Sequence, residues 1–193
     1  MTAPVRKKTP LQAEKILAAA THLFAHQRFH EVRMEDIACA AEVGKGTLYR
    51  YFKDKEELYA ALLDQASEEM AQHLRECAAG PGDPRARLEA ILSAYLHYFG
   101  EHPHLFDLIQ RAEVLSRPDH QISWQRTRQE SAELVQRVLE EGQRAGVFHL
   151  QDAHLASWFL LGGLRAVMRF DKAAFGPDMA ARLVDLFLCG AAR

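Results

Sequence analysis

The chain has 193 residues, is 48% hydrophobic and carries a net charge of −2, which is enough apolar material for one compact body or two small ones. No apolar run approaches the roughly 18 to 20 residues of a membrane-spanning helix, and the N-terminus lacks the apolar core of a signal peptide, so we expect a cytoplasmic protein with no membrane partner. Residues 1–60 carry 10 Lys or Arg against 8 Asp or Glu, a net charge of +2, whereas residues 61–193 carry 14 against 18, a net charge of −4. A nucleic-acid binder needs positive charge where it meets its partner, and the sign of this asymmetry agrees with one without establishing it.

Helical periodicity recurs along the whole sequence without the sustained alternation that marks strands, so we predict an all-α fold. The first helix is predicted from Leu11 to about Ala25, with Thr9 as its N-cap and Pro10 at its first position. A short second helix is predicted from about Met34 to Ala41, with Ile37 facing inward. It is too short to be stable without packing against its neighbours.

A tight turn and a third short helix follow. The turn is Glu42-Val43-Gly44, and the helix is Lys45–Phe52, in which Leu48 and Phe52 are spaced for burial on one face. Two short helices joined by a tight turn are typical of proteins that place the second helix in the DNA major groove. A polar surface turn would have the same spacing, and this alternative stays open. The side chains expected to reach DNA are those of Lys45, Gly46, Thr47, Tyr49, Arg50 and Tyr51.

Basic residues flank this segment. Lys53 and Lys55 stand at the start of the next helix, where their charge would hold the DNA backbone. Asp54 and Glu57 form a predicted capping box for that helix. The basic stretch at residues 6–8 is either a disordered tail or an arm that follows the DNA backbone.

The second part of the chain is predicted to consist of helices alone. We divide the chain into a helix-turn-helix head at residues 1–54 and a helical body at residues 55–193. The fourth helix should extend to about Ala79, where a Gly- and Pro-rich stretch breaks the chain and Asp83 begins the next helix as N-cap. The helices that follow are predicted at Pro84–Phe99, Pro103–Leu115, Asp119–Ala145, Asp152–Phe170 and Pro177–Cys189.

The last two predicted helices are apolar on more than one face, which requires a second covering surface. The simplest cover is the same helix pair of a second subunit, packed as a four-helix bundle about a two-fold axis. The residues expected at this dimer interface are Leu155, Phe159, Gly162, Gly163, Leu183 and Phe187.

Residues 13 to about 65 resemble the N-terminal domain of TetR/AcrR-family regulators. The resemblance is carried by Ile37-Ala38, Val43, Gly46-Thr47-Leu48-Tyr49, Tyr51-Phe52 and Lys55-Glu56-Glu57-Leu58. It implies an all-α homodimer whose paired heads bind a palindromic operator in double-stranded DNA, and which releases that DNA when a small molecule enters the C-terminal domain. By position, it implies that Lys45, Gly46, Thr47, Tyr49 and Tyr51 face DNA, that Lys55 contacts phosphate, and that Ile37, Val43, Leu48 and Phe52 form the head core.

The chain departs from the family pattern at several positions, among them Gln27-Arg28-Phe29, which lacks the common glycine before the phenylalanine. Glu42 stands where the turn usually has a glycine, and a left-handed conformation there costs a non-glycine residue about 1–2 kcal/mol. Gly44 replaces the usual serine cap, although glycine is a tolerable N-cap. Arg33 replaces a threonine at the start of the second helix, from which its side chain is expected to reach phosphate.

An unidentified small-molecule effector is expected in the body, with no cofactor. Aromatic and polar residues of the middle helices are the candidate lining, although aromatic residues at helical spacing usually form plain core. These candidates are Tyr95, Phe99, His104, Phe106, Ile109, Trp124, Arg128, Trp158, Arg165 and Met168. A regulator whose body only dimerises, and a binding protein or enzyme with a vestigial head, are the alternatives.

Catalysis and metal binding find little support in the sequence. No GxSxG, HExxH or glycine-rich phosphate loop is present, so no enzyme is expected. His22, His26 and His30 recur every four residues and are interpreted as a solvated helix face rather than as metal ligands. Cys39, Cys77 and Cys189 are far apart and are expected to be buried, reduced thiols.

Overall fold

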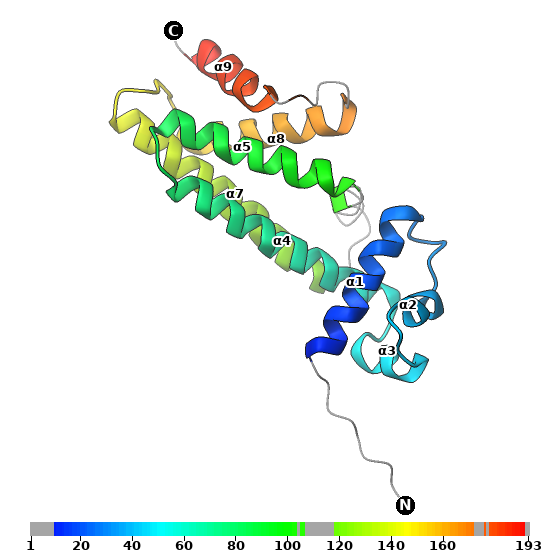
Figure 1. The fold of residues 1–193 in the computed structure, drawn as a ribbon. Coiled ribbons are helices and arrows are strands. Elements are labelled where there is room, and N and C mark those ends of the chain that lie inside the picture. The colour runs from blue at the N-terminus through cyan, green and yellow to red at the C-terminus, as the bar shows by residue number, and fades with distance from the viewer. Residues whose placement is uncertain (1–9, 104, 107–117, 172–175, 177, 192–193) are drawn as a thin grey trace, which may run out of the picture. The chain divides into compact units, whose positions relative to one another are not determined.

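The computed structural model describes residues 10–103, 105, 106, 118–171, 176 and 178–191, and this part of the chain contains helices and no strand (Figure 1). The all-α prediction is confirmed. The helices are α1 (Pro10–His26), α2 (Met34–Ala40), α3 (Lys45–Tyr51), α4 (Lys55–Ala79), α5 (Pro84–Glu101), α7 (Pro118–Arg144), α8 (Ala153–Phe170) and α9 (Met179–Ala191). Of the predicted helix Pro103–Leu115, the described residues Pro103, Leu105 and Phe106 are helical, and the others lie outside the described residues.

The helix starts follow the capping residues seen in the sequence. Pro10 is the first residue of α1, while the predicted cap Thr9 lies outside the described residues. The carboxylates of Asp83 and Asp152 accept hydrogen bonds from the backbone N–H groups three residues later, at 2.8 and 2.9 Å. Each bond satisfies an N–H group that has no partner inside its helix, which explains why α5 and α8 begin where they do.

The start of α4 differs in one detail from the predicted capping box. Asp54 accepts a hydrogen bond from the backbone N–H of Glu57 at 2.8 Å, as predicted. The Glu57 carboxylate, however, accepts from the backbone N–H of Lys53 at 2.6 Å, one residue before the expected donor Asp54. The bond from Glu57 back along the chain therefore fixes Lys53, the residue before the N-cap, rather than the N-cap residue Asp54 itself.

The described chain forms two compact units. The first contains the residues up to Ala66 and the short segment that begins at His102, and the second contains Ser67–Glu101 and the residues from α7 onward. Because the boundary lies within α4, this helix contributes its first part to one unit and its second part to the other. The expected domain limits at residues 54 and 55 stay a prediction.

The first unit, which we call the head, is built around one apolar cluster. Side chains of α1, α2, α3 and the first part of α4 form this cluster, among them Ile16, Ile37, Leu48 and Leu58, each 0% exposed. Val43 packs against its edge. The predicted burial of Ile37, Leu48 and Phe52 is thus confirmed. Helices α2 and α3 have only seven residues each, and the core that they share with α1 and α4 holds them in place.

The second unit, which we call the body, packs α5 against α7 and α9, and α7 against α8. Its fully buried side chains include Leu88, Leu139, Phe148 and Leu164. At the end of α7, the Val147 N–H donates to the Gly142 carbonyl at 2.8 Å while Gly146 takes a positive φ of 72°, a glycine-terminated helix end. A Cβ atom at Gly142 would collide with the Phe148 ring, so glycine is required there.

Candidate nucleic-acid interface

The turn between α2 and α3 ends α2 with a residue in the left-handed conformation. Glu42 has φ 54°, and the Val43 N–H donates to the Ala38 carbonyl at 2.9 Å. This is the hydrogen bond that closes a Schellman helix end, in which the left-handed position is usually a glycine. The left-handed conformation expected for Glu42 is confirmed. The bond turns the chain sharply, so that Val43 packs on the head core and α3 starts directly afterwards.

Gly44 is the N-cap of α3, as expected, with extended backbone angles of φ −67° and ψ 146°. Its carbonyl accepts hydrogen bonds from the N–H groups of Thr47 and Leu48, at 2.8 and 3.1 Å. A Cβ atom added at Gly44 or at Gly46 would meet nothing within 4 Å. Neither glycine is therefore required for packing within the head, and the open space beside Gly46 leaves room for a ligand to approach the backbone.

The side chains of α3 are divided between the core and the surface. Leu48 is fully buried and anchors the helix, while Lys45, Gly46 and Tyr49 are exposed. Thr47, Arg50 and Tyr51 are half-buried. The exposed residues thus form one polar and aromatic surface on a helix that the core holds rigidly, which is the arrangement that reading a major groove requires.

Four of the predicted contact residues interact within the head. The Tyr51 hydroxyl donates to Gln12 Oε1 of α1 at 3.1 Å, and the Arg50 guanidinium lies over the Tyr51 ring at 5.4 Å from its centroid. The Lys45 ammonium lies 5.9 Å from the centroid of the Tyr49 ring. Tyr51 is therefore fixed from the side of α1, whereas Tyr49 remains on the exposed surface beside Lys45.

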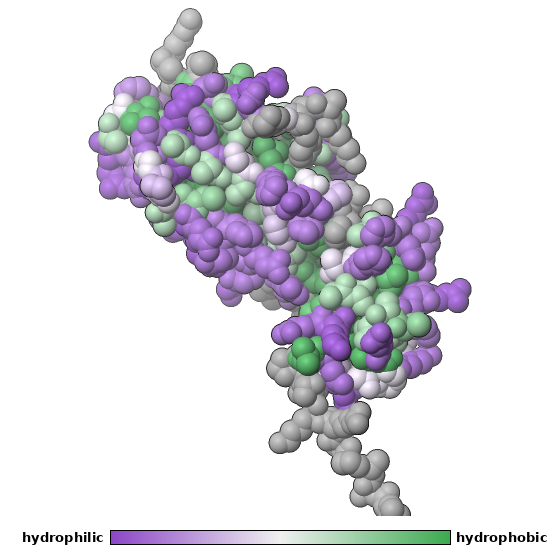
Figure 2. Space-filling model, viewed as in Figure 1, coloured by the Kyte–Doolittle hydropathy of each residue, from purple (hydrophilic) through white to green (hydrophobic). Residues whose placement is uncertain are grey.

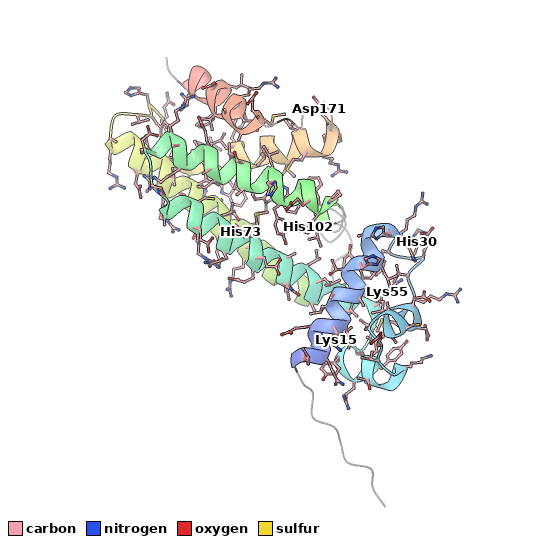
Figure 3. All side chains as sticks on the ribbon, viewed as in Figure 1. Lys15, His30, Lys55, His73, His102 and Asp171 are labelled. Carbon is pink, nitrogen blue, oxygen red and sulfur yellow. The ribbon has the colours of Figure 1, made fainter. Side chains whose placement is uncertain are left out.

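Lys55 is held within the head (Figure 3). Its ammonium donates to the carbonyls of Phe29 at 2.6 Å and Val32 at 2.9 Å, and it lies 4.3 Å from the centroid of the Phe29 ring. These contacts bind the connection between α1 and α2 to the start of α4. A phosphate contact by Lys55 stays a prediction, and it would require the ammonium to share these carbonyl partners.

Lys53 and Arg33 both have exposed side chains at the starts of helices. Arg33 is the N-cap of α2, and its backbone N–H donates to the Asp36 carboxylate at 3.0 Å. The aspartate therefore supplies the bond that closes the start of α2, and the arginine side chain is not needed for it. Both cations are placed where phosphate could reach them.

One residue of this surface was not identified in the sequence. Glu35, in the first turn of α2, lies 2.6 Å from the Lys45 ammonium through Oε1. The hydrogen bond and the charge of Lys45 hold the pKa of Glu35 below its ordinary value, and Glu35 raises the pKa of Lys45. Both groups are thus charged at neutral pH. Glu35 and Lys45 are ten positions apart on two different helices, so a search for neighbouring charges along one helix does not find the pair.

Some of the candidate effector residues are brought together in the body. The rings of Tyr95 and Phe99 are 5.1 Å apart on α5, and both are buried. The Arg128 guanidinium lies over the Trp158 ring at 5.3 Å, which joins α7 to α8. Of the remaining candidates, Met168 is buried and Arg165 half-buried in α8, and Phe106 is buried in the head unit. His104, Ile109 and the Trp124 side chain lie outside the described residues.

The predicted dimer residues leave an apolar face open on α8 and α9. Leu155 is 66% and Phe159 is 73% exposed, and Gly162 and Gly163 are exposed as well. Leu183 and Phe187 are half-buried, next to Leu186, which is 73% exposed. Figure 2 shows hydrophilic side chains over most of the described surface in view, with apolar ones in patches between them. Several large apolar side chains exposed on adjacent helices typically mark an interaction surface.

The expectation of buried thiols is wrong for Cys39, which is exposed on α2, and Cys77 is only half-buried. Helix α2 is so short that one side of it suffices for the core, and Cys39 lies on the other side with Glu35. The Cys189 side chain lies outside the described residues.

His22, His26 and His30 are exposed, as expected of a solvated face, and the described residues contain no group of three potential metal ligands. None of the described helices is long and apolar enough to cross a membrane.

Comparisons with known proteins agree with this geometry. The family model described as bacterial regulatory proteins of the tetR family matches residues 16–62, and that of the tetracyclin repressor-like C-terminal domain matches residues 81–170. The transcriptional repressor NicS of Pseudomonas putida is 28% identical over 175 residues, covering 89% of this chain and 82% of NicS. The transcriptional activator FasR of Mycolicibacterium smegmatis is 29% identical over 104 residues, covering 54% of this chain and about half of FasR (48%).

Solved structures share the fold over nearly the whole chain. A transcriptional regulator of the TetR/AcrR family from Thermobifida fusca superposes with a TM-score of 0.80 and 25% identity, covering 94% of this chain and 99% of that structure. The two family models account for the head and for most of the body in the order in which the structure presents them. The chain therefore belongs to the TetR family of bacterial transcriptional regulators, and α2 and α3 are its DNA-binding helix-turn-helix.

Proposed function

We propose that the protein is a homodimeric repressor that binds a palindromic operator and leaves it when a small molecule binds the body. The observation that carries the proposal is the surface of α3, where Lys45 and Tyr49 are exposed on a helix anchored by the buried Leu48. Lys45 supplies charge for the backbone, and Tyr49 supplies a ring and a hydroxyl for base edges or phosphate. Gly46 between them lets the DNA approach the helix closely.

The apolar face of α8 and α9 supports the dimer. We propose that a second copy of the chain covers Leu155, Phe159 and Leu186, since a two-fold axis brings the same face of each subunit together. Two heads related in this way would read two inverted half-sites. Their recognition helices must then lie about 34–36 Å apart, one turn of DNA, to enter successive major grooves on one side of the duplex.

The effector is proposed to bind in the body, where Tyr95, Phe99 and Met168 supply apolar surface and Arg165 a charge. A small molecule that binds the DNA-free state more tightly shifts the protein toward that state, and the coupling is necessarily reciprocal. Operator and effector should therefore weaken each other's binding by the same factor. A regulator whose body only dimerises would show no such coupling with any metabolite tested.

The direction of regulation depends on where the operator lies relative to the promoter. Of the relatives, NicS is named a repressor and FasR an activator. Repression is proposed here because a dimer on a palindrome that overlaps a promoter blocks polymerase without any further contact. Fusing the chain's upstream region to a reporter tests this, and deletion of the chain's gene should raise expression.

The experiment that tests DNA recognition is retention of tiled upstream DNA by the purified protein. The wild type should retain one palindromic fragment at moderate salt, and Tyr49→Ala should lose about 5- to 150-fold in affinity for it, as expected for about 1–3 kcal/mol from one contact residue. His30→Ala removes an exposed side chain from the connection between α1 and α2 and serves as the matched control. Equal retention by Tyr49→Ala and the wild type would refute the assignment of α3.

A further inference from the structure

A negative charge stands on the same surface as the residues proposed to bind DNA. Glu35 and Lys45 join α2 to α3 by an ion pair of 2.6 Å, and their side chains are 52% and 64% exposed. The Lys45 ammonium also lies over the Tyr49 ring. Lys45, the first residue of α3, therefore already has a carboxylate partner in the DNA-free protein.

The pair has little to do in holding α2 against α3. Ile37 and Leu48 are both 0% exposed in the shared core, and the backbone bond from Val43 to Ala38 fixes the turn. An exposed ion pair adds little to such a packed contact, because water and salt screen it. A role in stability does not explain why a carboxylate stands at this surface.

We propose that Glu35 restrains DNA binding: it holds Lys45 in an intramolecular ion pair that the phosphate backbone of duplex DNA must displace. The inference rests on the proposed function of α3. A lysine that binds phosphate releases a condensed counterion from the DNA, which is the source of sequence-independent affinity. A carboxylate at 2.6 Å cancels the charge that Lys45 would bring, and it repels the same phosphate once the ammonium has moved.

The restraint acts on affinity for any sequence, and it thereby favours the operator. Contacts to base edges add to binding on the operator alone, whereas backbone contacts add to binding on every duplex. Weakening one backbone contact lowers the affinity for the many competing sites of a genome by the same factor as the affinity for the operator. A nearly saturated operator loses a smaller fraction of its occupancy than the weakly occupied competing sites do. The ion pair therefore increases the share of bound protein that is on the operator.

Glu35→Gln removes the charge and keeps the shape of the side chain. The matched control is Asp64→Asn, which removes one negative charge from an exposed position of α4 in the same unit. Asp64 lies nine residues beyond the first residue of α4, about 14 Å along the helix at 1.5 Å per residue. Lys45→Gln and the double variant Glu35→Gln/Lys45→Gln complete a cycle that isolates the pair.

The test measures fluorescence anisotropy of a labelled 30-base-pair duplex of mixed sequence with the full-length protein, between about 50 and 200 mM KCl. Glu35→Gln should bind several-fold more tightly than the wild type at the low-salt end. The slope of log K against log salt concentration should steepen by up to about 0.9 for each head that contacts the duplex. Asp64→Asn should match the wild type, and the double variant should match Lys45→Gln.

The outcomes separate the two proposals. If the wild type binds the duplex but Glu35→Gln has the same affinity and slope, or gains as much in the Lys45→Gln background as alone, the restraint is refuted and the assignment of α3 stands. If the wild type binds neither this duplex nor any upstream fragment at 50 mM KCl, the proposed function fails and the restraint fails with it. Circular dichroism of each variant verifies that the helices are intact.

Discussion

The hydroxyl of Tyr51 donates to Gln12 Oε1 across 39 positions of sequence, and so ties the last turn of α3 to the first turns of α1. The resemblance to the family led to the expectation that both Tyr49 and Tyr51 face DNA. The structure gives them different surroundings, because Tyr51 is half-buried against α1 and Arg50 while Tyr49 is exposed beside Lys45. The two tyrosines can therefore be separated by experiment.

Tyr51→Phe removes this hydroxyl and keeps the ring. A hydrogen bond of this kind contributes about 0.5–1.5 kcal/mol to stability, so amide hydrogen exchange in α3 should report a head less stable by that amount. Gln12→Ala should give a similar loss, because it removes the other partner. DNA affinity should change less than two-fold in either variant, and a loss in Tyr51→Phe as large as that in Tyr49→Ala would assign the Tyr51 hydroxyl to DNA instead.

Lys55→Met and Lys53→Met form a matched pair of charge deletions two residues apart. Lys55→Met removes the donor to the Phe29 and Val32 carbonyls, and charged hydrogen bonds of this kind contribute about 1.5–3 kcal/mol each, so the head should be clearly destabilised. Lys53→Met removes an exposed charge and should change stability by less than about 0.5 kcal/mol. Urea denaturation followed by circular dichroism compares the two, and equal stabilities would contradict the structural role of Lys55.

Glu42→Gly removes the strain of a non-glycine residue in the left-handed conformation at the end of α2. The strain of about 1–2 kcal/mol is offset in part by the greater freedom of glycine in the unfolded chain, about 0.4–1 kcal/mol, which leaves a net stabilisation of up to about 1.6 kcal/mol. Hydrogen exchange of the α2 backbone amides measures this gain in stability. Glu42→Ala, which keeps the strain, should show no gain, and a gain in both variants would place its origin in the charge instead.

Gly46→Ala separates folding from DNA binding. An added Cβ meets nothing within 4 Å, and alanine is favoured over glycine inside a helix by about 0.8–1.0 kcal/mol, so the variant should be more stable than the wild type. Its affinity for the retained upstream fragment should nevertheless fall if the DNA approaches the backbone at this point. An alanine variant that binds DNA as tightly as the wild type would show that the open space beside Gly46 is not used.

The thiols should differ in their dependence on pH. Burial and the neighbouring charge of Glu76 raise the pKa of Cys77, whereas Cys39 is exposed on α2. Because the thiolate is the reactive form, iodoacetamide should label the exposed Cys39 faster than Cys77 at pH 8, and the difference in rate should narrow as the pH rises toward the raised pKa of Cys77. Mass spectrometry of the labelled peptides follows both, with Cys39→Ser as control. Labelling of Cys77 at the rate of Cys39 would contradict its half-buried environment.

Much of the fold could be predicted because its determinants are local in sequence. Periodic burial predicted helices that agree with α1, α2, α3 and α8 to within a residue or so at most ends, and Asp83 and Asp152 predicted where α5 and α8 begin. The left-handed Glu42 was predicted from its place in the turn. Each of these features depends on contacts within a few residues, which the sequence displays directly.

The surroundings of the interface could not be predicted, because they depend on contacts between helices. Lys45 was expected to face DNA, yet the Glu35 carboxylate lies 2.6 Å from its ammonium across the turn. Lys55 was expected to reach phosphate, yet two carbonyls of the α1–α2 connection surround its ammonium. The shared core determines how the helices pack, and this packing brings such pairs together. Helical periodicity predicts which residues are buried, but not which polar side chains of different helices come into contact.

Recognition of DNA by the head is tested most directly by hydroxyl-radical footprinting on the upstream fragment that the wild type retains. Two protected half-sites are expected, inverted with respect to each other and centred about 34–36 Å apart or a multiple of that distance. Tyr49→Ala should lose this protection at the protein concentration that saturates the wild type, and His30→Ala should keep it. A wild-type footprint that Tyr49→Ala reproduces in full, or no protection on any upstream fragment, would contradict the assignment of α3 as the recognition helix.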